Sequence, residues 1–223
     1  MFRNIWDALK KSPLLDDSFE IMDELHHRTQ EMFLLSMRVL MDQKTDPQEI
    51  IKMDKEVNKN VQRVRKKVFE YFSLSSVPNI HSGLIMISLV IDYERIGDYA
   101  KDLALMRNEF EFEGNLQEEG RDELGRMKDL ILLMFDEAHD SFVNMDEEYP
   151  TRVTHMEEEL KVHYETLKDW TRTKNIRRDE ALVEIVSARL LKRIAGHLDN
   201  ISSSGARPFP KLGFKHGASS WDD

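Results

Sequence analysis

DYERIGDYAKDLA, residues 92–104, is the stretch that decides the fold. Glu94 and Asp98 are four residues apart, so on a helix their carboxylates lie one turn apart on the same face. Burying ionised carboxylates costs several kcal/mol unless positive charge compensates them. We therefore expect a Lys or Arg, a proton or a metal ion beside this pair. The same helical face also carries an apolar row, which the two carboxylates interrupt: Ile80, Leu84, Ile87, Ile91 and Leu105.

The composition favours long helices. The chain has 223 residues, enough for one large domain or two of about 110 residues. Its 9 Gly and 6 Pro are few, and the prolines fall between periodic segments, which argues against strands and tight hairpins. A net charge of −10 opposes direct nucleic-acid binding.

The absence of cysteine indicates the compartment and restricts the metal chemistry. Without Cys, disulfides and thiolate ligands are excluded, and a reducing cytoplasm is the default location. The longest apolar run is shorter than the roughly 18 residues that a membrane span needs. The charged start of the chain predicts no secretion signal. We therefore expect a cytoplasmic protein that reaches a membrane only through a partner.

Apolar periodicity predicts an all-α fold of six long helices. Within that pattern, Pro47 is a natural first-turn residue and Asp46 is placed to cap its helix. The predicted helices are Ser18–Asp42, Pro47–Phe72, Asn79–Arg107, 121–148, 150–173 and 178–203.

The second half of the chain repeats the first. A shift of 103 residues places Asp54 on Glu157, and a shift of 102 places Phe33 on Phe135. A shift of 98 residues places Tyr99 on His197. We therefore predict two tandem three-helix bundles related by a pseudo-twofold axis. The predicted organisation is a short amphipathic leader (1–17), a first bundle (18–107), a linker (108–120), a second bundle (121–203) and a C-terminal tail (204–223).

The run Glu-Arg-Ile-Gly-Asp at 94–98 resembles the signature of the PhoU family. The run KRIAGHLDNI (192–201) is a decayed copy of it, and IIKMDKEVNKNV (50–61) is similar to the family's second acidic motif. The resemblance covers about residues 18–203. It implies paired three-helix bundles and cytosolic, non-enzymatic regulation of phosphate uptake and phosphate signalling. It also implies contact with a membrane phosphate transporter subunit or, in some members, a sensor kinase.

The resemblance implies a metal site as well, because family members hold metal clusters on paired acidic motifs. The matching residues in the first bundle are Asp54, Asn58, Glu94 and Asp98. Asn58 replaces an acid, which keeps an oxygen ligand but should lower affinity for a hard cation. Oxygen ligands suit Fe, Mn, Mg or Ca. The residues alone equally allow an internal ion pair with a Lys or Arg from another helix.

The matching site in the second bundle is predicted to be lost. Two of its four ligand positions carry lysines and one carries no side chain, so we expect Lys161 or Lys192 to pair with Glu157. The four positions are Glu157, Lys161, Lys192 and Gly196.

Two other patterns could bind metal. Glu24 with His27, and Asp136 with His139, have the Glu/Asp-x-x-His spacing of ferritin-like di-iron bundles. The alternative function is therefore a ferritin-like oxidase or metal-storage protein, although His27 aligns with Asp129, which favours solvated surface histidines. His155, Glu159 and His163 also form a stripe at helical spacing.

Neither an enzyme nor a particular assembly is indicated. No nucleophile–base pair and no Gly-rich phosphate loop is apparent, so the sequence offers no catalytic machinery. A helical adaptor without metal, and a homo-oligomer, both stay open at this stage.

Overall fold

The computed structural model describes residues 15–41, 46–144, 149–204 and 209–213. Most of the predicted leader (1–17) and most of the predicted tail (204–223) therefore lie outside the described residues.

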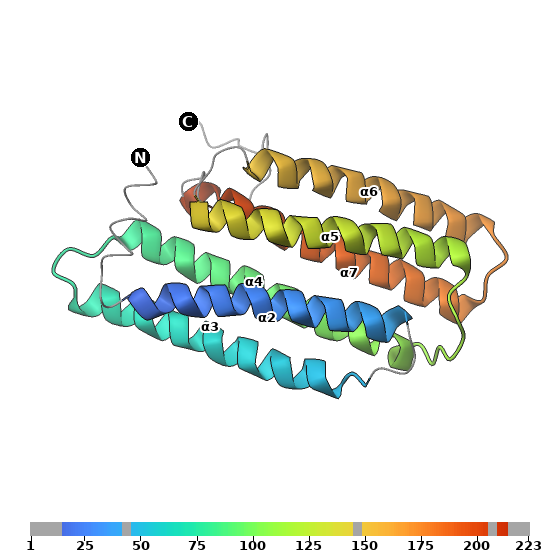
Figure 1. Ribbon diagram of the computed structural model, residues 1–223, viewed down its shortest axis with the longest axis horizontal. Helices are drawn as coiled ribbons and strands as arrows, with labels where there is room; N and C mark the ends of the chain where they lie inside the picture. Colours follow the sequence, from blue (N-terminus) through green and yellow to red (C-terminus); the bar gives the residue numbers. More distant parts are fainter. Residues whose placement is uncertain (1–14, 42–45, 145–148, 205–208, 214–223) are drawn as a thin grey trace.

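Six long helices make up the described chain, as predicted (Figure 1). Every regular element in the described ranges is helical, including a short 3-10 turn, η1 (Phe209–Lys211). At the linker, α5 begins three residues earlier than predicted, which leaves 110–117 between the two halves. The helices are α2 (Asp16–Met41), α3 (Gln48–Leu74), α4 (Ile80–Glu109), α5 (Glu118–Asn144), α6 (Tyr149–Thr173) and α7 (Arg178–Ser203).

The six helices form two three-helix bundles that lie side by side. Helices α2, α3 and α4 pack on one another, and so do α5, α6 and α7. The bundles meet mainly where α4 packs against α7, with a smaller contact between α2 and α5. Helices α3 and α6 lie at opposite edges of the molecule (Figure 1).

Residues that are equivalent in the two repeats meet their own counterparts where the bundles join. The rings of Tyr99 and His197 have centroids 5.7 Å apart. Those of Phe33 and Phe135 are 5.8 Å apart. A residue can touch its own equivalent only beside a twofold axis, as in an isologous dimer interface. The predicted pseudo-twofold arrangement is therefore confirmed.

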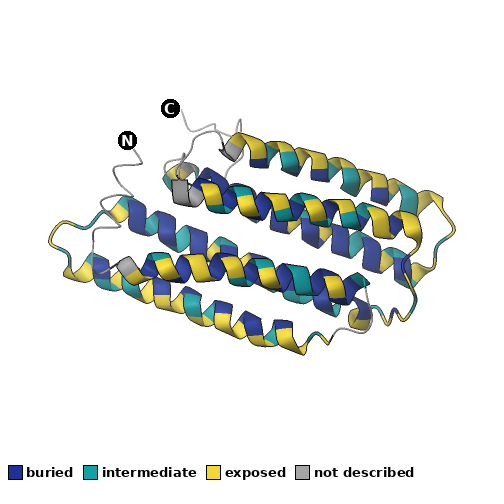
Figure 2. Ribbon diagram, in the orientation of Figure 1, coloured by how far each residue is buried: buried dark blue, intermediate teal, exposed yellow. Residues whose placement is uncertain are grey.

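The face of α4 that carries Glu94 and Asp98 lies at the edge of the core, which corrects the expectation that these carboxylates are buried. Their side chains are 27% and 32% exposed, and Ile91 on the same face is 38% exposed. Helix α4 packs against α2, α3 and α7, so it is apolar over most of its circumference. Its buried side is carried by other residues, among them Leu89, Tyr93 and Leu103. The buried stretches of the helices are dark blue in Figure 2.

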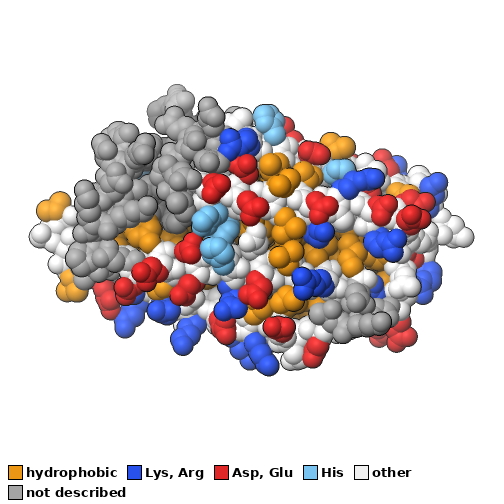
Figure 3. Space-filling model, in the orientation of Figure 1, with side chains coloured by type: hydrophobic (Ala, Val, Ile, Leu, Met, Phe, Trp, Pro, Cys, Tyr) orange, Lys and Arg blue, Asp and Glu red, His pale blue; other side chains and the backbone are white. Residues whose placement is uncertain are grey.

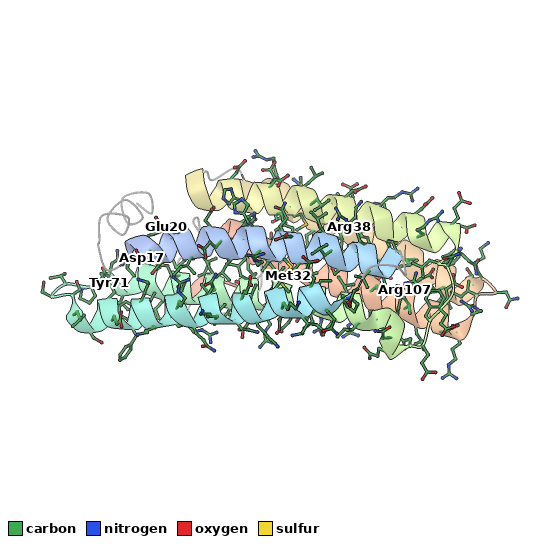
Figure 4. All side chains as sticks on the ribbon, turned by 60° about the horizontal axis from the view of Figure 1, so that its bottom comes forward. Asp17, Glu20, Met32, Arg38, Tyr71 and Arg107 are labelled. Atoms are coloured by element: carbon green, nitrogen blue, oxygen red, sulfur yellow. The ribbon has the colours of Figure 1, made fainter. Side chains whose placement is uncertain are left out.

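Local interactions fix the helix ends and the linker. Asp46 Oδ1 accepts a hydrogen bond from the Gln48 N–H at 2.9 Å, in the capping role predicted for it. At the same end of the first bundle, the buried Arg107 donates to the carbonyl oxygens of Leu40 and Gly114 at 2.6 and 2.8 Å. Arg107, labelled in Figure 4, thereby ties the end of α2 to the linker.

None of the helices in the described ranges is both long and apolar enough to cross a membrane.

Candidate functional site

The four residues predicted from the acidic motifs come together where α3 packs on α4. Asp54 is buried, and the Asn58 amide lies one turn further along α3, 3.5 Å from Asp54 Oδ2. Glu94 and Asp98 face them from α4. A fifth residue, Lys101, is also present, and its position was not predicted from the sequence.

The ammonium group of Lys101 binds two of the predicted ligands. Its Nζ lies 3.0 Å from Asp54 Oδ2 and 3.1 Å from Asp98 Oδ1. Burial opposes the charged amine, but the hydrogen bonds to both carboxylates outweigh it and raise the pKa of Lys101. The lysine is therefore a permanent cation that compensates the buried Asp54.

Glu94 has a separate cationic partner. Its Oε2 lies 3.5 Å from a guanidinium nitrogen of Arg65, which projects from α3. Asp98 is also approached by Arg95 at 3.5 Å. The cluster is thus an ion-pair network, with cations from both helices rather than from a partner helix alone.

The donor chemistry of this cluster suits a hard cation, since it offers three carboxylates and one amide oxygen. Within the described residues, however, the three carboxylates do not converge to within 4.8 Å of one another. Lys101 lies between two of them. A metal ion would have to displace the ammonium and draw Glu94 inward, so the predicted metal set stays a prediction.

The corresponding position in the second bundle also holds an ion pair. Lys161 Nζ lies 3.0 Å from Oε2 of the buried Glu157. Lys192 instead places its Nζ 4.9 Å from the centroid of the Tyr164 ring, a cation–π contact. Of the two lysines considered from the sequence, Lys161 is therefore the one that pairs with the glutamate.

The ferritin-like ligand set does not assemble. Glu24 accepts a hydrogen bond from Asn60 at 3.1 Å, and Asp136 accepts one from Gln30 at 3.2 Å. Only the two histidines, His27 and His139, approach each other, with ring centroids 5.4 Å apart.

The stripe on α6, which consists of His155, Glu159 and His163, does not form a metal-binding cluster among the described residues either. His163 Nδ1 lies 2.7 Å from a carboxylate oxygen of Glu123 on α5, and Glu159 is exposed.

Glu184 on α7 is an unusual residue that the sequence reasoning missed. It is fully buried, and neither carboxyl oxygen has a hydrogen-bond partner among the described residues. Burial, reinforced by the charge of Glu180, raises the pKa of Glu184 to about 8. The carboxyl group presses on Gly120, where an added Cβ would come within 1.9 Å of it. The internal repeat could have indicated this burial, because the same shift of 98 residues aligns Glu184 with Met86, which is buried in the first bundle.

We predict that Glu184→Gln stabilises the protein above about pH 5. The pKa of Glu184 rises from an ordinary 4.5 to about 8 on folding, so the wild type is fully stable with respect to this group only below pH 4.5. It then loses stability up to pH 8, by at most about 1.4 kcal/mol per pH unit. Glutamine stays neutral, so the free energy of unfolding of the variant should exceed that of the wild type by an amount that grows over this range.

Urea denaturation from pH 5 to 9 measures this difference. Glu159→Gln, at an exposed position on α6, is the matched control and should show no such trend. A constant difference between the Glu184→Gln variant and the wild type across the range would show that Glu184 does not titrate as described.

The comparisons with known proteins agree on both halves of the chain. The family model of the PhoU domain matches residues 22–106 and again residues 124–204. A crystal structure of PhoU from Pseudomonas aeruginosa is similar, with a TM-score of 0.78 and 20% sequence identity, covering 86% of this chain and 95% of that chain. At 20% sequence identity, this structural similarity is evidence for the fold alone. No curated protein matches the sequence.

Proposed function

We propose that this chain, which belongs to the PhoU domain family, is a cytoplasmic, non-enzymatic regulator of phosphate uptake and phosphate signalling. The observation that carries the proposal is the match of both repeats to the family domain. Regulation is exerted through protein contacts, with a membrane phosphate transporter subunit as the partner and a sensor kinase as the second candidate.

The surface that best suits such a partner is the apolar tip of the first bundle, where α3 turns into α4. Four large apolar side chains are exposed there, and Val77 is 86% exposed. Exposed apolar residues that gather in one place are typical of protein interaction sites. The apolar tip consists of Phe69, Leu74, Val77 and Ile80.

The direct test is co-purification of a phosphate-transporter subunit from the source cell with the tagged chain. We expect Val77→Asp to reduce the captured subunit about tenfold or more, because a charge at the centre of an apolar contact must be desolvated on binding. Val162→Asp, at a position on α6 that is 63% exposed, carries the same substitution away from the apolar tip and should behave as wild type.

Two results would contradict the proposal. If phosphate uptake in phosphate-rich medium is unchanged after the gene is deleted, the protein does not regulate that uptake. Equal capture of the subunit by the Val77→Asp and Val162→Asp variants would show that the contact does not involve the apolar tip.

A metal in the first bundle is the second part of the proposal. Its ligands would be the oxygens of Asp54, Asn58, Glu94 and Asp98, and the ion would be Fe, Mn, Mg or Ca. Support comes from the oxygen-rich donor set, and the competing group is the ammonium of Lys101. Any divalent ion that binds here must therefore displace the ammonium group of Lys101.

Mn²⁺ uptake measured by elemental analysis tests this exchange. Glu94→Ala combined with Asp98→Ala should abolish the uptake, because two of three anionic ligands are lost. Lys101→Met should increase the affinity at least tenfold, because the competing cation is gone. Lys66→Met, at a lysine whose side chain is 77% exposed, is the control. Unchanged stoichiometry in the double variant would place any bound manganese elsewhere.

A further inference from the structure

Three side chains from the two bundles converge on the surface where α2 meets α5. Asp23 and His27 come from α2, and His139 comes from α5. One potential ligand atom from each lies within 4.8 Å of the other two, and no other group of three or more His, Asp or Glu in the described part of the chain does this. Figure 3 shows histidine side chains gathered on this face with acidic groups beside them.

The spacing of the three groups fits a small transition-metal ion. His139 Nε2 lies 2.8 Å from Asp23 Oδ1, and a ring nitrogen of His27 lies within 4.8 Å of a ligand atom of each of the other two residues. Two ligands of a tetrahedral Zn²⁺ stand about 3.3 Å apart, given bonds of roughly 2.0–2.1 Å. Pairs of ligand atoms would therefore have to move by at most about 1.5 Å relative to each other to admit an ion, because none of them is separated by more than 4.8 Å.

A hydrogen bond already orients His27 as a ligand. His27 Nδ1 lies 2.9 Å from the Asp23 carbonyl oxygen and must donate its proton to it, which leaves the lone pair on Nε2. His139 now donates from Nε2 to Asp23. On metal binding this proton is replaced by the ion, and the neutral ring carries its hydrogen on Nδ1. Nδ1 lies 4.0 Å from the carboxylate of Asp140, which would have to move closer to accept that hydrogen.

The buried imidazole ring of His26 covers one side of the cluster. The ring of His26 packs 4.7 Å from that of His139. On the other side the cluster is open, since the side chain of His27 is 62% exposed and that of Asp23 is 53% exposed. Water can therefore complete the coordination.

We propose that Asp23, His27 and His139 bind Zn²⁺ or a similar late first-row ion such as Co²⁺, and that the ion links the two bundles at the α2–α5 contact. Two imidazoles and one carboxylate are a ligand set for such ions rather than for Mg²⁺ or Ca²⁺. The site is distinct from the oxygen-only cluster around Asp54, and it does not depend on the proposed phosphate role.

Co²⁺ serves as the probe because its visible absorption reports bound nitrogen and oxygen ligands. The full chain, metal-free and without a histidine tag, is titrated with Co²⁺ and then with Zn²⁺. We expect one Co²⁺ per chain, displaced by Zn²⁺, and a Zn²⁺-dependent rise in the melting temperature. Asp23→Asn and His139→Gln should each weaken binding at least tenfold, since even loss of an outer-shell partner costs about 10–100-fold.

Two controls separate this site from the others. His155→Gln, on the exposed face of α6, and the double variant Glu94→Ala with Asp98→Ala should bind Co²⁺ as the wild type does. His27→Gln replaces Asp23→Asn if circular dichroism shows that the latter is unfolded. No Co²⁺ spectrum in the wild type, or equal binding by the wild type and the His139→Gln variant, would overturn the proposal.

Discussion

The contact between the two bundles is the constraint on which the rest of the structure depends. Neither bundle buries all of its own apolar surface, because α4 is apolar on the side facing α7 as well as on the sides facing α2 and α3. Packing α4 against α7 removes that surface from water and provides the dominant favourable term for joining the halves. The meeting of Tyr99 with His197, and of Phe33 with Phe135, shows that one interface serves both copies symmetrically.

This arrangement also determines where charged groups can lie. With most of α4 covered, the stripe that holds Glu94 and Asp98 is left at the edge, where cations from α3 and α4 reach it. At this equivalent position, each bundle pairs a buried acid with one of its own lysines, Lys101 for Asp54 and Lys161 for Glu157. A covalently attached charge is always present, whereas a bound ion depends on its free concentration. A metal ion that binds at Asp54 or at Glu157 would therefore have to displace one of these lysines.

Much of the fold was predictable from the sequence, because periodicity and internal repetition are local signals. They located six helices and paired Tyr99 with His197 as equivalents. The site was predictable only in part. Asp54, Glu94 and Asp98 were found by their spacing, but Lys101 was missed because a cation was sought on another helix, whereas it lies three residues beyond Asp98 on the same one.

The features that escaped prediction depend on the tertiary structure. Glu184 looks like an ordinary helix-surface acid until the packing of α7 against Gly120 encloses it. Asp23 and His139 are 116 residues apart in sequence, and only the α2–α5 contact brings them together. Spacing along one helix carries no information about such a pair, which is why the sequence paired the histidines with Glu24 and Asp136 instead.

The central claim is that the joined bundles form one cooperative unit, and native-state hydrogen exchange in low urea tests it most directly. The slowest amides of α4 and α7 should exchange with the same free energy of opening and the same urea dependence, because neither helix can leave the interface without exposing the other. A second bundle, α5 to α7, that opens with a clearly lower free energy while α2 to α4 stay protected would contradict the account.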